Sequence, residues 1–106
     1  MEQFRIIYRI LRIMQRSMDC EEFDRERISA EALGLSEPMW RRIMALLVKN
    51  GYIEGVKVIV CDLSDAPVIK YTGCPEITMK GLEYLEDNSM MKKAAHLARG
   101  VIEIIT

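Results

Sequence analysis

The feature that most constrains the fold is a capped amphipathic segment, residues 36–50, which passes directly into a β-rich segment. Ser36 is a favourable N-cap, and Pro38 near the first turn costs little because the amides there lack helical acceptors. Asn50 and Gly51 tolerate the left-handed backbone that commonly ends a helix. The sequence therefore predicts a helix over residues 36–50 that is followed at once by a strand.

The segment after this helix has the pattern of a β-hairpin. Apolar residues recur at every second position from Val56 to Val60, and β-forming residues resume at Val68 after the turn-rich loop DLSDAP. We expect a register with Cys61 opposite Val68, Val60 opposite Ile69 and Val58 opposite Tyr71. This register would give the hairpin one apolar face to pack on the helices.

Four further helices are predicted around this unit. Residues 4–18 form an amphipathic helix whose apolar arc is wider than one core surface requires. Ser29 can cap a short helix over residues 30–33, and Gly34 can end it. After the hairpin, Thr78 is a suitable N-cap for a helix, and residues 90–106 have the pattern of a last one.

The order helix, short helix, helix, hairpin, helix, helix predicts an α+β fold of the winged helix-turn-helix type. A three-helix core and a β-hairpin wing would be followed by two additional C-terminal helices. The 106 residues, of which 50% are hydrophobic, suit one domain with a real core. We expect a single winged-helix domain over residues 1–106, with core and wing in 1–75 and the C-terminal helices in 76–106.

Three blocks of sequence carry a resemblance to a known family: VKNGYIEGVKV, APVIKYTGCPEITMKG and LEYLEDNS. The chain resembles the YjcQ-like family of small winged-helix proteins of bacteria and their prophages. The matching positions are Gly51, Tyr52, Ile53, Gly55, Val56, Gly73, Pro75, Glu76, Ile77, Thr78, Lys80, Gly81, Tyr84 and Leu85. The resemblance covers nearly the whole chain, most specifically residues 50–85. It implies a winged-helix fold and DNA binding, and it brings no catalytic residues.

In a winged helix, residues 36–50 occupy the position of the recognition helix, which lies in the major groove of DNA. Trp40, Ile43, Met44 and Leu47, flanked by Met39 and Leu46, are expected to form its buried face. On the other face, Arg41 and Arg42 suit guanine edges and phosphates. Ala45 permits close approach and Lys49 suits a phosphate. The candidate DNA-binding residues are Ser29, Ser36, Arg41, Arg42, Ala45, Lys49, Lys57 and Lys70.

Other observations favour alternatives to DNA binding. Exposed arginines are expected on any amphipathic helix, so Arg41 and Arg42 can simply be solvated. The predicted wing tip carries Asp62 and Asp65 and no base, and the net charge of the chain is −1. Acidic side chains are repelled by phosphates. A winged-helix module that binds a protein partner without binding DNA therefore stays open.

The strongest charge feature is an arginine stripe on the first helix, formed by Arg5, Arg9, Arg12 and Arg16. It can be a solvated or ion-paired face, a nucleic-acid contact or a membrane-surface contact, in that order of preference. The first and last predicted helices both have excess apolar surface. We expect them to pack together and, in a homodimer, to form the contact between copies.

Several function classes have no support in the sequence. No nucleophile, phosphate-loop or metalloprotease motif is present, so we expect a protein that is not an enzyme. Three scattered cysteines and one histidine have no ligand spacing, so we expect no metal or cofactor and free thiols in a reducing compartment. No uncharged apolar run approaches the roughly 20 residues of a membrane span. A cytoplasmic protein is therefore predicted.

Overall fold

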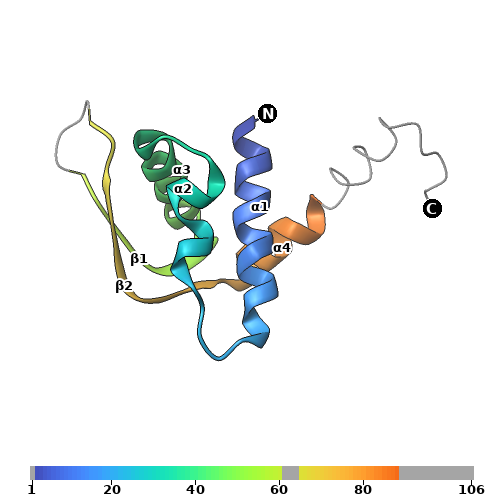
Figure 1. The fold of residues 1–106 in the computed structure, drawn as a ribbon. Coiled ribbons are helices and arrows are strands. Elements are labelled where there is room, and N and C mark those ends of the chain that lie inside the picture. Colours follow the sequence, from blue (N-terminus) through green and yellow to red (C-terminus); the bar gives the residue numbers. More distant parts are fainter. Residues whose placement is uncertain (1, 61–64, 89–106) are drawn as a thin grey trace.

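The computed structural model describes residues 2–60 and 65–88. Within these residues the fold is α+β, with four α-helices, two short 3₁₀ helices and one two-stranded antiparallel sheet (Figure 1). The elements are α1 (Glu2–Arg16), η1 (Ser17–Asp19), η2 (Arg25–Ile28), α2 (Ala30–Leu33), α3 (Glu37–Lys49), β1 (Ile53–Ile59), β2 (Val68–Ile77) and α4 (Met79–Asp87). This arrangement is compatible with a winged helix. The last predicted helix, residues 90–106, lies outside the described residues, as do Cys61 and Asp62 of the hairpin loop.

One hydrophobic core lies between α1, α3 and the base of the hairpin. Its most completely buried side chains are Ile10, Leu11, Ile28, Ile43, Met44 and Leu47. The helix α1 begins and ends two residues earlier than expected. At its end the Ser17 hydroxyl donates to the Ile13 carbonyl at 2.9 Å, and the chain tightens into η1.

The predicted boundaries of α2 and α3 are confirmed by their caps. Ser29 accepts a hydrogen bond from the Ala32 amide at 3.1 Å, and Gly34 ends α2 with a φ of 70°. Ser36 accepts from the Met39 amide at 3.3 Å. At the start of α3, Trp40 donates its indole N–H to the Ile28 carbonyl at 2.7 Å. This bond ties α3 to η2.

The hairpin register differs by two residues from the expected one. Ile59 lies opposite Val68, which pairs Val58 with Ile69 and Val56 with Tyr71. Because β1 ends at Ile59, Val60 belongs to the loop between the two strands, and it is 65% exposed. A shift of two residues keeps every side chain on its expected face, so the apolar face still packs on the helices.

The strand pairing is irregular at Gly55, where this one residue of β1 lies opposite residues 72–75 of β2. The register shifts between Glu54 and Val56, and Gly55 has a φ of 84°. A Cβ atom at this position would lie 2.5 Å from the Cys74 carbonyl oxygen of β2. Only glycine fits both the backbone conformation and the close approach of the strands.

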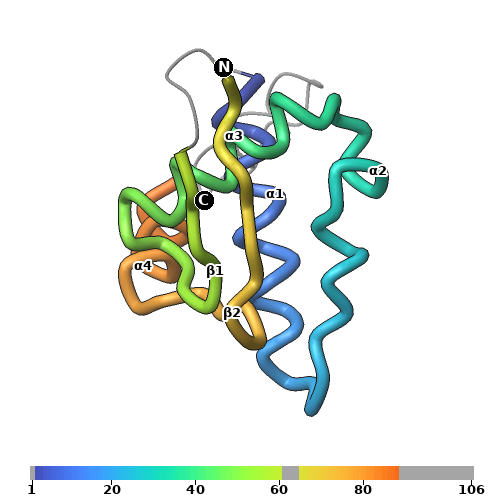
Figure 2. Tube along the Cα trace, turned by 90° about the vertical axis from the view of Figure 1, so that its left-hand side faces the viewer, coloured from blue at the N-terminus to red at the C-terminus, as the bar shows by residue number. Residues whose placement is uncertain are grey.

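Thr78 and Gly81 anchor α4 to the end of α3. The Thr78 hydroxyl accepts from the Gly81 amide at 3.1 Å and donates to the Gly51 carbonyl. Gly81 is buried against the Tyr52 carbonyl and the Ile77 side chain, which leaves no room for a Cβ. As a result α4 lies against α1, at the opposite end of the hairpin from its loop (Figures 1 and 2).

Candidate functional site

The outer face of α3 and the hairpin together form an open groove. On the α3 side it is lined by Arg42, Ala45, Leu46, Val48 and Lys49, and on the hairpin side by Val58, Val60 and Pro67. Its volume is about 540 Å³. The structure therefore brings three of the predicted site residues, Arg42, Ala45 and Lys49, to one surface. Arg41 is half-buried and does not line the groove.

This placement follows from the helical period of α3. Ile43, Met44 and Leu47 are buried in the core, so positions 42, 45 and 49 lie on the other side of the helix. Arg42 and Lys49 are seven residues apart, which corresponds to two turns and about 10 Å along the helix. Ala45 lies between them and is too small to fill the groove.

The groove is mainly apolar, which the sequence did not lead us to expect. Leu46 was predicted to flank the buried face, but it is 43% exposed and forms part of the groove wall. Met39, also predicted to flank that face, is exposed as well. Val60 extends the apolar face of the hairpin beyond the core. The continued alternation from Val56 to Val60 was the sequence signal that could have indicated such a surface.

Lys57 and Lys70 lie away from the groove. They are exposed and directly opposite each other across the hairpin. Side chains alternate along a strand, so these lysines point to the opposite face from Val56 and Val58. Arg42 and Lys49 of α3 therefore lie on the groove side of the hairpin, and Lys57 and Lys70 lie on its other side.

The hydroxyls of Ser29 and Ser36 serve as helix caps. Ser29 donates its only hydroxyl proton to the Glu26 carbonyl at 2.8 Å and accepts from the Ala32 amide. It can donate to a phosphate only if the bond to Glu26 opens. Ser36 is exposed, and its oxygen accepts from the Met39 amide. Phosphate contacts from these serines stay a prediction.

The arginine stripe lies on α1 and is separate from the groove. Arg5, Arg9 and Arg16 are exposed, whereas Arg12 is half-buried and donates to the side chain of Gln15 at 2.6 Å. The stripe is therefore a second basic surface on a different helix from the α3 cations.

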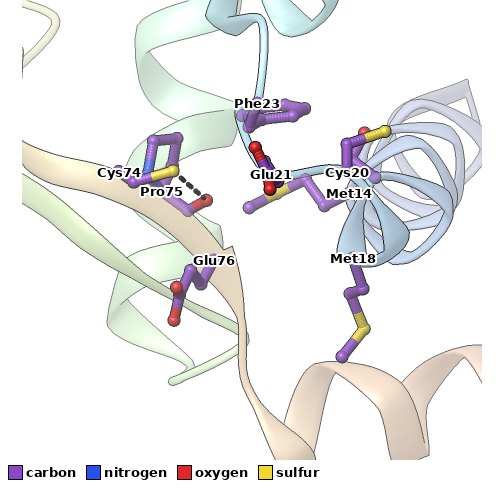
Figure 3. A pocket seen from close by; sticks show the side chains of 9 residues that line it. Met14, Met18, Cys20, Glu21, Phe23, Cys74, Pro75 and Glu76 are labelled. Atoms are coloured by element: carbon purple, nitrogen blue, oxygen red, sulfur yellow. Dashed lines mark hydrogen bonds between the residues drawn. The ribbon is translucent and has the colours of Figure 1, made fainter.

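A second, smaller pocket lies between the end of α1 and β2. Figure 3 shows Cys74 and Pro75 on one side of it and Phe23 and Cys20 on the other. Its volume is about 120 Å³. Both cysteines are free and exposed, and the Cys74 thiol donates a weak hydrogen bond to the Pro75 carbonyl at 3.9 Å. In residues 2–60 and 65–88, no three His, Cys, Asp or Glu side chains are grouped to hold a metal ion.

Two tyrosines with shifted pKa values lie outside the groove. Burial raises the pKa of Tyr71, while the Arg25 guanidinium, 4.8 Å from the ring centroid, acts in the opposite direction. Burial also raises the pKa of Tyr84, whose ring packs 5.1 Å from that of Tyr52. The stacking of Arg25 on Tyr71 fixes the connection before α2 to the hairpin.

Comparison with known proteins identifies the family of the chain. The family model described as YjcQ protein matches residues 8–104, in agreement with the resemblance seen in the sequence. No curated protein and no solved structure matches the chain. In the residues that the structure describes, no helix has the length and apolar character needed to cross a membrane. Because the matched region spans most of its length, the chain belongs to the YjcQ family.

Proposed function

We propose that this chain is a cytoplasmic winged-helix DNA-binding protein that regulates transcription in a bacterium or prophage. In this proposal α1, α2 and α3 are the three-helix core, and β1 and β2 are the wing. The supporting observation is that α3 carries Arg42 and Lys49 two turns apart on an exposed face, next to the hairpin. A helix of this kind fits the major groove of B-DNA, which is about 12 Å wide.

Each of the predicted DNA-contacting cations has a distinct task in the proposal. Arg42 donates two hydrogen bonds to the O6 and N7 atoms of a guanine, and the nearby Arg41 contacts a base edge or phosphate. Ala45 lets the helix approach the bases closely. Lys49, Lys57 and Lys70 contact phosphates, which supplies affinity without sequence preference. The protein acts by binding and is not an enzyme.

The charge distribution predicts modest affinity for one protomer. Three or four phosphate contacts give a slope of about −3 to −4 for the logarithm of affinity against the logarithm of salt concentration. The exposed Asp65 near the hairpin loop lowers affinity further. A homodimer formed through α1 and residues 90–106 would add a second half-site and raise the affinity for a palindromic sequence.

The test is to select bound fragments from the source genome and to measure affinity for a selected and a scrambled fragment at several salt concentrations. Arg42→Ala should weaken binding to the selected fragment by about 1–3 kcal/mol and reduce discrimination. Lys49→Ala should weaken binding to both fragments and lower the salt slope by about one. Arg16→Ala is the matched control, because Arg16 is exposed on α1 away from α3. The proposal is wrong if Arg41→Ala/Arg42→Ala leaves both affinity and salt slope unchanged.

A second candidate function is a protein-interaction module, and the apolar groove favours it. Leu46 and Val60 are exposed on opposite walls of the groove, where a protein side chain could bury them. Capture of one protein partner, together with no shift of genomic fragments at low salt, would favour this function over DNA binding.

A further inference from the structure

We propose that the groove between α3 and the hairpin binds an acidic amphipathic helix of a protein partner. The inference deepens the second candidate function by naming the chemistry of the partner, and it rests on that function. If the chain also binds DNA through Arg42 and Lys49, the partner would compete with DNA for these two cations. The lining, the shape and the charge of the groove all favour this occupant.

The lining indicates an apolar ligand. The groove is lined by the half-buried Ala45, Val48 and Val58 and by the more exposed Leu46 and Val60. None of the side chains between Arg42 and Lys49 that line the groove is polar. A ligand that buries these side chains gains roughly 25 cal/mol for each Å² of apolar surface removed from water. Phosphate and sugar groups of DNA cannot supply that contact.

The shape of the groove indicates an elongated ligand. One side is formed by α3 and the other by the hairpin, and the lining residues of α3 extend over the two turns from Arg42 to Lys49. An amphipathic helix fits such a groove by inserting apolar residues at i, i+4 and i+7. A helix therefore matches the dimensions better than a compact ligand.

The charge of the groove indicates an acidic partner. The only charged side chains that line it in the described part of the chain are Arg42 and Lys49, both positive. Their separation of about 10 Å matches two carboxylates seven residues apart on a helix lying alongside α3. The carboxylates would fix the orientation and register of the partner, while its apolar face supplies most of the affinity. Asp65, exposed near the hairpin loop, would repel acidic groups, so the acidic edge of the partner faces α3.

The experiment uses a displayed library of 18-residue amphipathic helices in which the polar positions are Glu, Gln or Lys. The library is selected on the full-length chain and counter-selected on Leu46→Ser. Enriched helices should carry carboxylates seven residues apart on one edge of an apolar stripe. Enrichment of neutral or basic helices, or no enrichment, would overturn the proposal.

The selected peptide is then measured by fluorescence polarisation. Leu46→Ser, Val60→Thr and Arg42→Ala should each weaken its binding by roughly fivefold to tenfold, as expected for the loss of a partly buried side chain or a charge pair. Leu46 and Val60 come from different elements and are both exposed, so one variant remains informative if the other unfolds. Arg9→Ala, on the exposed side of α1, is the control that should bind the peptide like the unchanged chain. If all three groove variants bind the peptide as tightly as the unchanged chain does, the inference is contradicted.

Competition separates this inference from DNA binding. The peptide should displace a bound genomic fragment from the unchanged chain but not from Leu46→Ser. If no fragment binds while the peptide binds as described, the DNA-binding proposal fails and the groove proposal stands. If a fragment binds but no acidic helix is enriched, the groove proposal fails and DNA binding stands.

Discussion

The side chain of Tyr84 has a polar group with an unmet hydrogen bond. Its hydroxyl is buried and has no hydrogen-bond partner in residues 2–60 and 65–88. Its ring packs against Tyr52 and contributes to the contact of α4 with the rest of the fold. A buried hydroxyl without a hydrogen-bond partner lowers the stability of the folded state. The aromatic ring of Tyr84 therefore stabilises the fold, whereas its hydroxyl does not.

Tyr84→Phe should therefore keep or raise stability, by up to about 1 kcal/mol, because it removes the unpaired hydroxyl and retains the ring. Denaturant unfolding at neutral pH measures this change. A loss of more than about 1 kcal/mol would show that the hydroxyl has a partner.

The same substitution should alter stability at alkaline pH. Burial raises the pKa of Tyr84 in the folded chain above its ordinary value of 10.0. As pH rises, the phenol therefore loses its proton in the unfolded chain before it does so in the folded chain. The contribution of this proton to the free energy of unfolding is fully present below about pH 10 and is lost as pH rises through the raised pKa of the folded chain. Tyr84→Phe should reduce the alkaline loss of stability. An unchanged alkaline profile would contradict the role assigned to this phenol.

At the scale of elements, local sequence signals predicted the helices better than the hairpin pairing. Ser29, Ser36 and Thr78 each cap the helix assigned to them, because a cap depends only on residues within one turn. The strand register depends on where β1 ends, and the alternation of valines is the same for a register shifted by two. The faces of the strands were therefore predictable, whereas the pairing partners were not.

The close approach of the two strands at Gly55 gives the sharpest test of the hairpin geometry. Gly55→Ala should cost about 2–4 kcal/mol, from the positive φ and the contact with the Cys74 carbonyl. Gly73→Ala is the matched control, since its Cβ would meet no atom within 4 Å and its φ is not positive. That control should change stability by no more than about 0.5 kcal/mol. Equal effects of the two substitutions in thermal or denaturant unfolding would contradict the close approach of the two strands at Gly55.

At the scale of the whole molecule, the candidate site depends on how α3 and the hairpin sit relative to each other. The amphipathic pattern of α3 was sufficient to predict that Arg42, Ala45 and Lys49 lie on its outer face. Arg41 was predicted there too, but it is half-buried and does not line the groove. It was not sufficient to predict that Leu46 and Val60 form opposite walls of one groove, because that depends on tertiary packing between two elements. For the same reason the sequence placed Lys57 and Lys70 in the site, whereas the pairing puts them on the other face of the hairpin.

We propose that the α3 surface beside the hairpin, and not the α1 arginine stripe, is where this YjcQ family member binds its ligand. The most direct measurement is the change in backbone amide NMR shifts when a selected DNA fragment is added to the full-length chain. We expect the largest changes at Arg42, Ala45 and Lys49 of α3. Large changes confined to Arg5, Arg9 and Arg16 of α1, with α3 unaffected, would contradict it.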